Sequence, residues 1–132
     1  MIASAEEFVS LRMSDDPERY RRAAHEAAAP GVWEDVVRRF PEMRFWVVIN
    51  KTVPLEILRE LSQDGDSRVR IAVAMKRKTP EDILTALARD QDEGVRLSVA
   101  RNPKTPVYIL RDMLGDEWPE VVDEVRRRLA DQ

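Results

Sequence analysis

The side chains best suited to catalysis or metal binding are few in this chain, and they stand apart from one another. His25 is the only histidine, and it lies inside a predicted helix with no second imidazole. A lone histidine makes a poor metal site and a poor general base. Asp15, Asp16 and Glu18 resemble a carboxylate cluster for a cation, but their place around Pro17 predicts helix N-capping and dipole compensation instead.

Sequence motifs for enzymes and cofactors are also missing. The chain has no cysteine, which excludes disulfides, thiolate zinc sites and cysteine-ligated iron–sulfur clusters. It contains no glycine-rich phosphate loop, no Gly-x-Ser-x-Gly and no His-Glu-x-x-His. We therefore expect a protein that is not an enzyme and that uses no metal or other cofactor.

Arginines at a fixed spacing are the most distinctive charged feature. Arg44, Arg70 and Arg96 lie 26 residues apart, so one such arginine per structural repeat would form a row able to contact a partner. The alternative is an internal bridge, in which turn carbonyls or aspartates hold each arginine. The aspartates repeat with the same period, which favours the bridge; they are Asp64, Asp90 and Asp116.

A second basic row lies in the predicted loops where helices end, without an obvious local partner. We expect these residues to contact something acidic; they are Lys51, Lys76, Arg77, Lys78, Arg101 and Lys104. Aromatic residues gather nearer the N-terminus, namely Trp33, Phe40, Phe45 and Trp46. Such a cluster favours a hydrophobic core, but an exposed Trp33 or Trp46 would be an anchor for a partner.

These residues belong to an internal repeat of 26 residues. Pro54, Pro80 and Pro106 keep this period, and several apolar positions keep it too: Ile57, Ile83 and Ile109; Leu58, Leu84 and Leu110; and Val47, Val73, Val99 and Val125. Each copy predicts two short helices with one apolar side, too little to fold alone. Stacked copies would bury a continuous core, as in a solenoid.

One copy, residues 67–91, illustrates the prediction. Its first helix is apolar nearly all round, which suits an inner position. The basic group of residues 76–78 ends this helix. We expect Thr79 to cap the second helix, Pro80 to take its first position, and Ile83, Leu84 and Leu87 to face the core.

The ends of the chain depart from the repeat. Before it we expect one helix from Pro17 to about Ala29, broken by Pro30, and another over residues 32–40. We predict a single all-α domain over residues 1–132, a right-handed α-solenoid. Residues 1–41 would form N-terminal capping helices, residues 42–117 the helical repeats, and residues 118–132 a C-terminal capping helix.

The segment from Val95 to Leu110, with Val95, Arg96, Val99, Ala100, Asn102, Pro103, Thr105, Pro106, Ile109, Leu110 and the later Asp116, resembles the leucine-rich repeat variant family. The resemblance covers about residues 43–118 and departs at Lys76 and Arg77, which replace Asn-Pro. It implies a right-handed stack of short helices related in style to HEAT repeats. It implies little about function, because such repeats serve unrelated proteins.

Charge separates the remaining functions. Lys and Arg total 22 against 25 Asp and Glu, and this net charge of −3 does not favour general polyanion binding. Solenoids present extended surfaces. We therefore expect a non-catalytic scaffold or adaptor that binds another protein. The alternative is nucleic-acid binding through the basic row, since lysine and arginine neutralise phosphates.

The composition and the N-terminal residues indicate the cellular location. No run approaches the roughly 18 apolar residues of a spanning helix, and Glu6 and Glu7 stand where a signal peptide would be basic or apolar. We expect a cytoplasmic protein with no membrane partner; the sequence does not fix its oligomeric state, although a monomer is favoured. The 18 arginines against 4 lysines, together with abundant alanine, indicate a GC-rich bacterial source.

Overall fold

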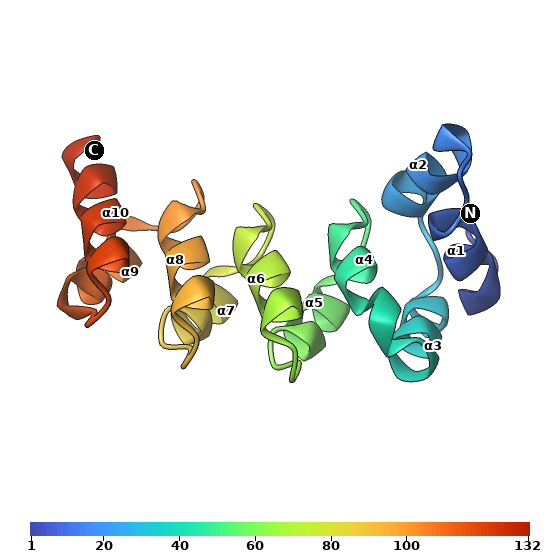
Figure 1. The fold of residues 1–132 in the computed structure, drawn as a ribbon, viewed down its shortest axis with the longest axis horizontal. Coiled ribbons are helices and arrows are strands. Elements are labelled where there is room, and N and C mark those ends of the chain that lie inside the picture. The colour runs from blue at the N-terminus through green and yellow to red at the C-terminus, as the bar shows by residue number, and fades with distance from the viewer. The chain divides into compact units, whose positions relative to one another are not determined.

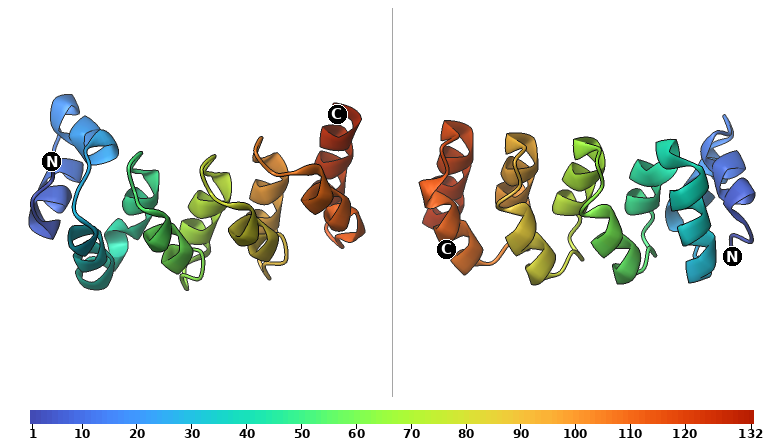
Figure 2. Two further views of the ribbon diagram at one scale, coloured as in Figure 1. Left: turned by 180° about the vertical axis from the view of Figure 1, so that it is seen from behind. Right: turned by 90° about the horizontal axis from the view of Figure 1, so that it is seen from below.

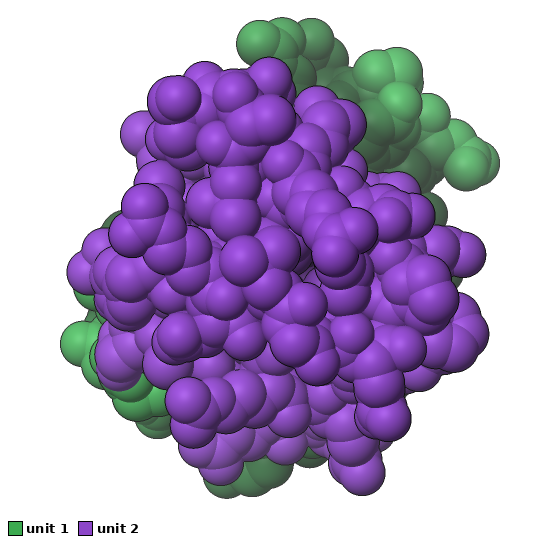
Figure 3. Space-filling view, turned by 90° about the vertical axis from the view of Figure 1, so that its left-hand side faces the viewer, with its two compact units in different colours: residues 1–61 green, residues 62–132 purple.

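The computed structural model describes all 132 residues and is all-helical, with ten α-helices, two short 3₁₀ helices and no strand. None of the helices has the length and apolarity needed to cross a membrane. Backbone contacts group the chain into two compact units, residues 1–61 and residues 62–132, coloured green and purple in Figure 3. Each unit is described by itself.

The first unit holds α1 (Ala5–Arg12), α2 (Pro17–His25), α3 (Pro30–Arg39), the 3₁₀ turn η1 (Pro41–Met43), α4 (Arg44–Ile49) and α5 (Leu55–Leu61). Helix α1 packs against α2 and α3, and α4 contacts α2, α3 and α5. Phe8 and Trp33 meet edge to face, with ring centroids 5.2 Å apart, at the centre of this core. Aromatic pairs of this geometry stabilise beyond the area that they bury.

Helix α1 was not anticipated, although its start carries a recognisable signal. The Ser4 hydroxyl accepts a hydrogen bond from the Glu7 amide at 3.0 Å, and the Glu7 carboxylate accepts one from the Ala3 amide at 2.9 Å. This reciprocal arrangement resembles a capping box, in which a serine and a glutamate three residues later satisfy free amides at the helix start. Phe8 and Leu11 then become the buried side of the helix.

The predicted bounds of the next helices need correction. Asp16 caps α2 as expected, accepting from the Glu18 amide at 3.0 Å. The helix ends at His25 instead of continuing to about Ala29, because the Ala27 carbonyl accepts from the Ile2 amide at 2.8 Å and draws this segment into an isolated bridge. Pro30 does not simply break a helix but opens α3, where its missing amide proton costs nothing.

The second unit holds α6 (Ser67–Met75), α7 (Glu81–Leu87), α8 (Glu93–Arg101), α9 (Val107–Asp112), the 3₁₀ turn η2 (Met113–Gly115) and α10 (Pro119–Ala130). Helix α8 packs between α6 and α10, as Figures 1 and 2 show. The shorter helix α7 contacts α6 and α8, and α9 contacts α10. The two-helix prediction for residues 67–91 therefore corresponds to α6 and α7.

Valines at corresponding positions of α6, α8 and α10 form the core of this unit. Each is at most 3% exposed; they are Val69, Val73, Val95, Val99, Val121 and Val125. The shorter helices contribute Ile83, Leu84, Leu87, Ile109 and Leu110, which are equally buried. Full burial of one such side chain contributes about 1.5–3 kcal/mol.

Gly94 permits the close approach of α6 and α8. A Cβ there would lie 2.9 Å from the Asp92 Oδ1 that caps α8 and 3.3 Å from Ile71 Cδ1 on α6. The Asp92 carboxylate accepts from the Gly94 amide at 2.7 Å, so it has little freedom to move away. A side chain at position 94 would therefore disturb both the cap and the packing between the helices.

The predicted threonine cap is wrong. The Thr79 hydroxyl donates to the Val73 carbonyl at 2.7 Å, and the Thr105 hydroxyl donates to the Val99 carbonyl at the same distance. Both threonines are buried, and α7 begins only after Pro80, whose side chain makes no cap hydrogen bond. Each hydroxyl is a second donor to a carbonyl at the end of the preceding helix. The Val73 carbonyl also accepts from the Lys76 amide, and the Val99 carbonyl from the Asn102 amide, both at 3.2 Å.

Candidate interaction surfaces

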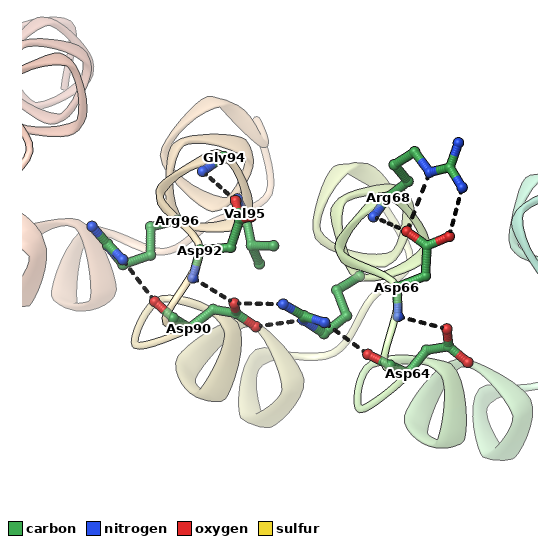
Figure 4. Close-up of polar contacts among 9 residues, drawn as sticks. Asp64, Asp66, Arg68, Asp90, Asp92, Gly94, Val95 and Arg96 are labelled. Atoms are coloured by element: carbon green, nitrogen blue, oxygen red, sulfur yellow. Dashed lines mark hydrogen bonds and ion pairs between the residues drawn. The ribbon is translucent and has the colours of Figure 1, made fainter.

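Arg70 and Arg96 are held inside the second unit by matching sets of hydrogen bonds. Arg70 donates from Nε and Nη2 to the Asp90 carboxylate at 2.9 and 3.1 Å, and from Nη1 to the Asp64 carbonyl at 2.8 Å. Arg96 donates from the same nitrogens to Asp116 at 2.8 and 3.3 Å and to the Asp90 carbonyl at 2.8 Å. Figure 4 shows Arg96 reaching the Asp90 carbonyl.

The aspartates also shape the turns that precede α6, α8 and α10. The Asp64 carboxylate accepts from the Asp66 amide at 3.0 Å, and Asp90 accepts from the Asp92 amide at 2.9 Å (Figure 4). Asp116 accepts from the Trp118 amide at 2.8 Å. The Asp90 and Asp116 carboxylates thus each fix both a turn and an arginine, which explains why arginine and aspartate share one spacing.

These contacts confirm the internal-bridge prediction for Arg70 and Arg96. The hydrogen bond to the partner carboxylate, acting against partial desolvation, raises the pKa of each arginine above its usual value. Arg44 in the first unit is engaged as well, donating from Nε to the Val37 carbonyl at 2.8 Å. The three arginines, offered by sequence as a candidate binding row, are therefore structural in their observed contacts.

A second set of side chains, missed by the sequence interpretation, ties neighbouring helices together through backbone carbonyls. The Asn102 amide donates to the Ala74 and Lys76 carbonyls at 2.8 and 3.0 Å, so the end of α8 is fastened to the end of α6. Arg128 on α10 donates from Nη1 to the Asn102 carbonyl at 3.0 Å. In the first unit, Asn50 donates to the Ala23 and Glu26 carbonyls at 2.8 and 3.0 Å.

The spacing of these residues was a usable signal. Asn50, Asn102 and Arg128 lie on the same 26-residue period as the prolines and valines, with Lys76 at the remaining position. Asn50 and Asn102 are almost fully buried. A buried amide needs acceptors within reach, and backbone carbonyls at the end of a neighbouring helix supply them.

The basic row of helix-ending residues lies largely in solvent. Lys51 in the first unit is exposed, as are Arg77, Lys78, Arg101 and Lys104 in the second, whereas Lys76 is half-buried. Desolvation around the Lys78 ammonium lowers its pKa. No ion pair or side-chain hydrogen bond engages Arg77, Arg101 or Lys104. These three cations are available to an acidic partner.

The two candidate tryptophans differ in burial. Trp33 is 0% exposed against Phe8, which corrects the expectation that it could anchor a partner. Trp46 is only half-buried. It meets Phe45 edge to face at 4.9 Å, and the Arg12 guanidinium carbon lies 3.4 Å from the centre of its indole ring. This is a close cation–π contact.

A pocket of about 280 Å³ opens beside this stacked pair. Helices α1, α2 and α4 line it with Arg12, Tyr20, Ala23, Ala24, Trp46 and Ile49. Tyr20 is 43% and Ile49 39% exposed, so two large apolar side chains border the opening. Sequence reasoning selected Trp46 but did not identify Arg12, Tyr20 or Ile49 as its neighbours in a surface pocket.

A larger and shallower groove of about 900 Å³ runs along the N-terminal segment, α3 and α5 of the first unit. Its lining mixes signs: Arg38 faces Asp35 at 2.8 Å, and Asp35 also pairs with Arg39 at 2.7 Å. Glu34, Glu56 and Glu60 line the groove as well. The mixed charges and open form give it less definition than the Trp46 pocket.

The residues considered first for chemistry are dispersed. His25 is exposed at the end of α2, and Asp16 is committed to its cap. No group of three or more histidine, aspartate or glutamate side chains is arranged to hold a metal ion.

No protein-family model, curated protein or solved structure matches the chain.

Proposed function

We propose that this protein is a non-catalytic interaction scaffold that binds another protein through its helical surface. The observation that carries the proposal is the Trp46 pocket, in which tryptophan, tyrosine and arginine side chains meet at the surface of the first unit. These three residue types dominate the energetics of protein–protein interfaces, where rigid aromatic side chains are buried in central pockets. Exposed Tyr20 and Ile49 extend the same surface.

The proposed architecture is a right-handed α-solenoid of 26-residue helix pairs, similar to leucine-rich repeat variant proteins. The matching bonds of Arg70 and Arg96, and of Thr79 and Thr105, support it, because equal spacing in sequence accompanies equal contacts. In a scaffold of this kind the internal bonds hold helices in a fixed relation while outer side chains remain available to a partner.

Affinity capture from a lysate of the native source, with and without nuclease, tests this function. We expect a discrete protein that remains bound after nuclease treatment and at moderate salt. The Trp46→Ala variant should retain less of it, provided that circular dichroism shows an unchanged helical content. Capture of nothing specific, or of nucleic acid with proteins that leave on nuclease treatment, would overturn the proposal.

Nucleic-acid binding remains the second candidate because Arg77, Arg101 and Lys104 are exposed cations that form no ion pair and no side-chain hydrogen bond within the protein. Phosphate contacts would make the affinity fall steeply with salt concentration. Reversal of Arg77, Lys78 and Lys104 to glutamate should abolish such binding and leave a complex at the Trp46 pocket intact. A shallow salt dependence, or unchanged binding after the reversal, would exclude this candidate.

A further inference from the structure

Arg12 carries a charge that no acidic side chain of the protein neutralises, unlike Arg22, Arg38 and Arg39 of the same unit. Arg22 pairs with Glu26, and Arg39 pairs with Glu6 and Asp35. Arg12 makes no ion pair and no side-chain hydrogen bond. Its Nε is buried without an acceptor, whereas its two terminal nitrogens are not buried.

The Trp46 ring fixes the direction of this charge. With the guanidinium carbon 3.4 Å from the ring centre, the planar group lies against the indole, which orders the side chain before any ligand arrives. A guanidinium presents parallel N–H donors that match the two oxygens of a carboxylate. A pre-ordered donor loses less side-chain entropy on binding than a freely rotating one.

The remainder of the pocket is apolar and small. Tyr20, Ala23, Ala24 and Ile49 complete the lining, and the volume is about 280 Å³. Pockets for drug-sized ligands and cofactors occupy about 300–1,000 Å³, so this one suits one or two amino-acid side chains. The pocket therefore matches a ligand that carries a carboxylate and an apolar group side by side.

We propose that the Trp46 pocket binds a peptide segment of a partner protein in which an aspartate or glutamate stands next to a bulky apolar residue. The carboxylate accepts hydrogen bonds from the terminal nitrogens of Arg12, and the apolar side chain packs against Tyr20 and Ile49. This inference rests on the proposed scaffold function and specifies the chemistry of its partner.

The observations favour a peptide over a nucleic acid at this pocket. Residues 1–61 contain 11 acidic and 9 basic side chains, which does not attract a polyanion. The Arg12 guanidinium already lies over the Trp46 ring, where a nucleobase would stack. A side-chain carboxylate needs only the one cation that the pocket provides.

Selection from a displayed library of random 12-residue peptides tests the inference with the full-length chain. We expect enrichment of sequences that place aspartate or glutamate beside leucine, phenylalanine or tryptophan. Selected peptides are then synthesised with an amidated C-terminus, so that only side-chain carboxylates are present, and their Kd is measured by fluorescence anisotropy. Replacement of the acidic residue by its amide should weaken binding at least tenfold.

Variants of the protein locate the site. Arg12→Gln should raise the Kd of the selected peptides at least tenfold. Ile49→Glu should also raise the Kd, because it places a negative charge beside the bound carboxylate. Arg21→Gln is the matched control, since it removes an exposed arginine from α2 outside the pocket lining and should leave the Kd unchanged. The exposed position of Ile49 makes its variant tolerable even if changes at Trp46 disturb folding.

Several results would overturn the inference. These are the absence of enriched peptides, enrichment without an acidic residue, a Kd insensitive to Arg12→Gln, or displacement of the peptide by a single-stranded oligonucleotide at equal affinity. Failure of this inference can be distinguished from failure of the scaffold proposal. If Arg12→Gln and Ile49→Glu capture the same nuclease-resistant protein as the wild type, the scaffold function stands and the Trp46 pocket is not its site.

Discussion

Removal of Arg96 should destabilise the second unit more than removal of a surface arginine that also forms an ion pair. The Arg96 and Asp116 side chains are 13% and 7% exposed, and the arginine makes two bonds to this carboxylate and one to the Asp90 carbonyl. Arg96→Met keeps most of the aliphatic stem. It leaves the Asp116 carboxylate without its counter-charge and the Asp90 backbone carbonyl without the donor that Arg96 supplies.

The expected magnitude follows from these contacts. Breaking a fully buried ion pair by removing one partner costs about 3–5 kcal/mol. Asp116 keeps its bond from the Trp118 amide and some contact with water. We therefore expect a loss of about 2–3 kcal/mol in the free energy of unfolding, somewhat below the cost for a fully buried pair. With a urea m-value of about 1–3 kcal/mol/M, the midpoint should fall by about 1 M or more.

Equilibrium unfolding in urea, followed by circular dichroism at 222 nm, provides the assay. Arg68→Met is the matched control, because Arg68 also pairs with an aspartate, Asp66 at 2.9 Å, but its side chain is 83% exposed. Exposed pairs contribute little, so this variant should unfold close to the wild type. A midpoint for Arg96→Met that coincides with that of Arg68→Met would refute the structural role of the arginine row.

Three further predictions concern the buried core, the hydrogen bonds of the Asn102 side-chain amide, and the change of stability at low pH. Leu84→Asp should unfold the second unit, since Leu84 is 1% exposed and an unpaired charge there has no compensation; a melting curve like that of the wild type would contradict the helix-pair packing. Asn102→Ala should lower the free energy of unfolding by about 1–3 kcal/mol, because the Ala74 carbonyl loses its side-chain donor and the Lys76 carbonyl keeps only the Thr79 amide; denaturant titration measures this loss, and an unchanged midpoint would contradict a structural role for Asn102. The hydrogen bond from Arg22, aided by the N-terminal ammonium, lowers the pKa of Glu26 from 4.5 to about 2. A depressed pKa stabilises the folded state above the unfolded value and loses this effect as the pH falls toward 2. Glu26→Gln should therefore reduce stability at pH 7 but match the wild type near pH 2, and a difference that persists at pH 2 would contradict this assignment.

The sequence predicted those contacts whose two partners share one period. Arg96 and Asp116 recur together with Arg70 and Asp90, so a bridge could be inferred before any geometry was known. The buried valines of α6 and α8 were equally accessible, because helical spacing alone places them on one side. Periodicity carries this information without any knowledge of the loops.

Local competition between hydrogen bonds explains the errors in helix bounds. Thr79 satisfies a rule for N-capping, yet its hydroxyl donates to the Val73 carbonyl at the end of the preceding helix. Likewise, α2 stops at His25 since the Ala27 carbonyl pairs with Ile2, a residue 25 positions earlier. Ile2 is distant from Ala27 in sequence, and Val73 lies in the helix before Thr79, so a capping rule that considers only the residues after the cap identifies neither partner.

The Trp46 pocket was beyond sequence inference for a related reason. Arg12 and Trp46 are 34 residues apart and follow no common spacing, so only the packing of α1, α2 and α4 brings them together. Trp33 and Trp46 look alike as sequence features. The edge-to-face contact with Phe8 buries the first, whereas the second remains at the surface.

Site-specific photo-crosslinking in the native host tests the central claim most directly. A benzoylphenylalanine in place of Tyr20 would stand at the border of the Trp46 pocket, and the same residue in place of Tyr108, which is also exposed, would report on the second unit. We predict a discrete protein adduct at position 20 that Arg12→Gln diminishes and that position 108 does not form. The absence of a protein adduct at position 20, or crosslinking of nucleic acid in its place, would contradict the account.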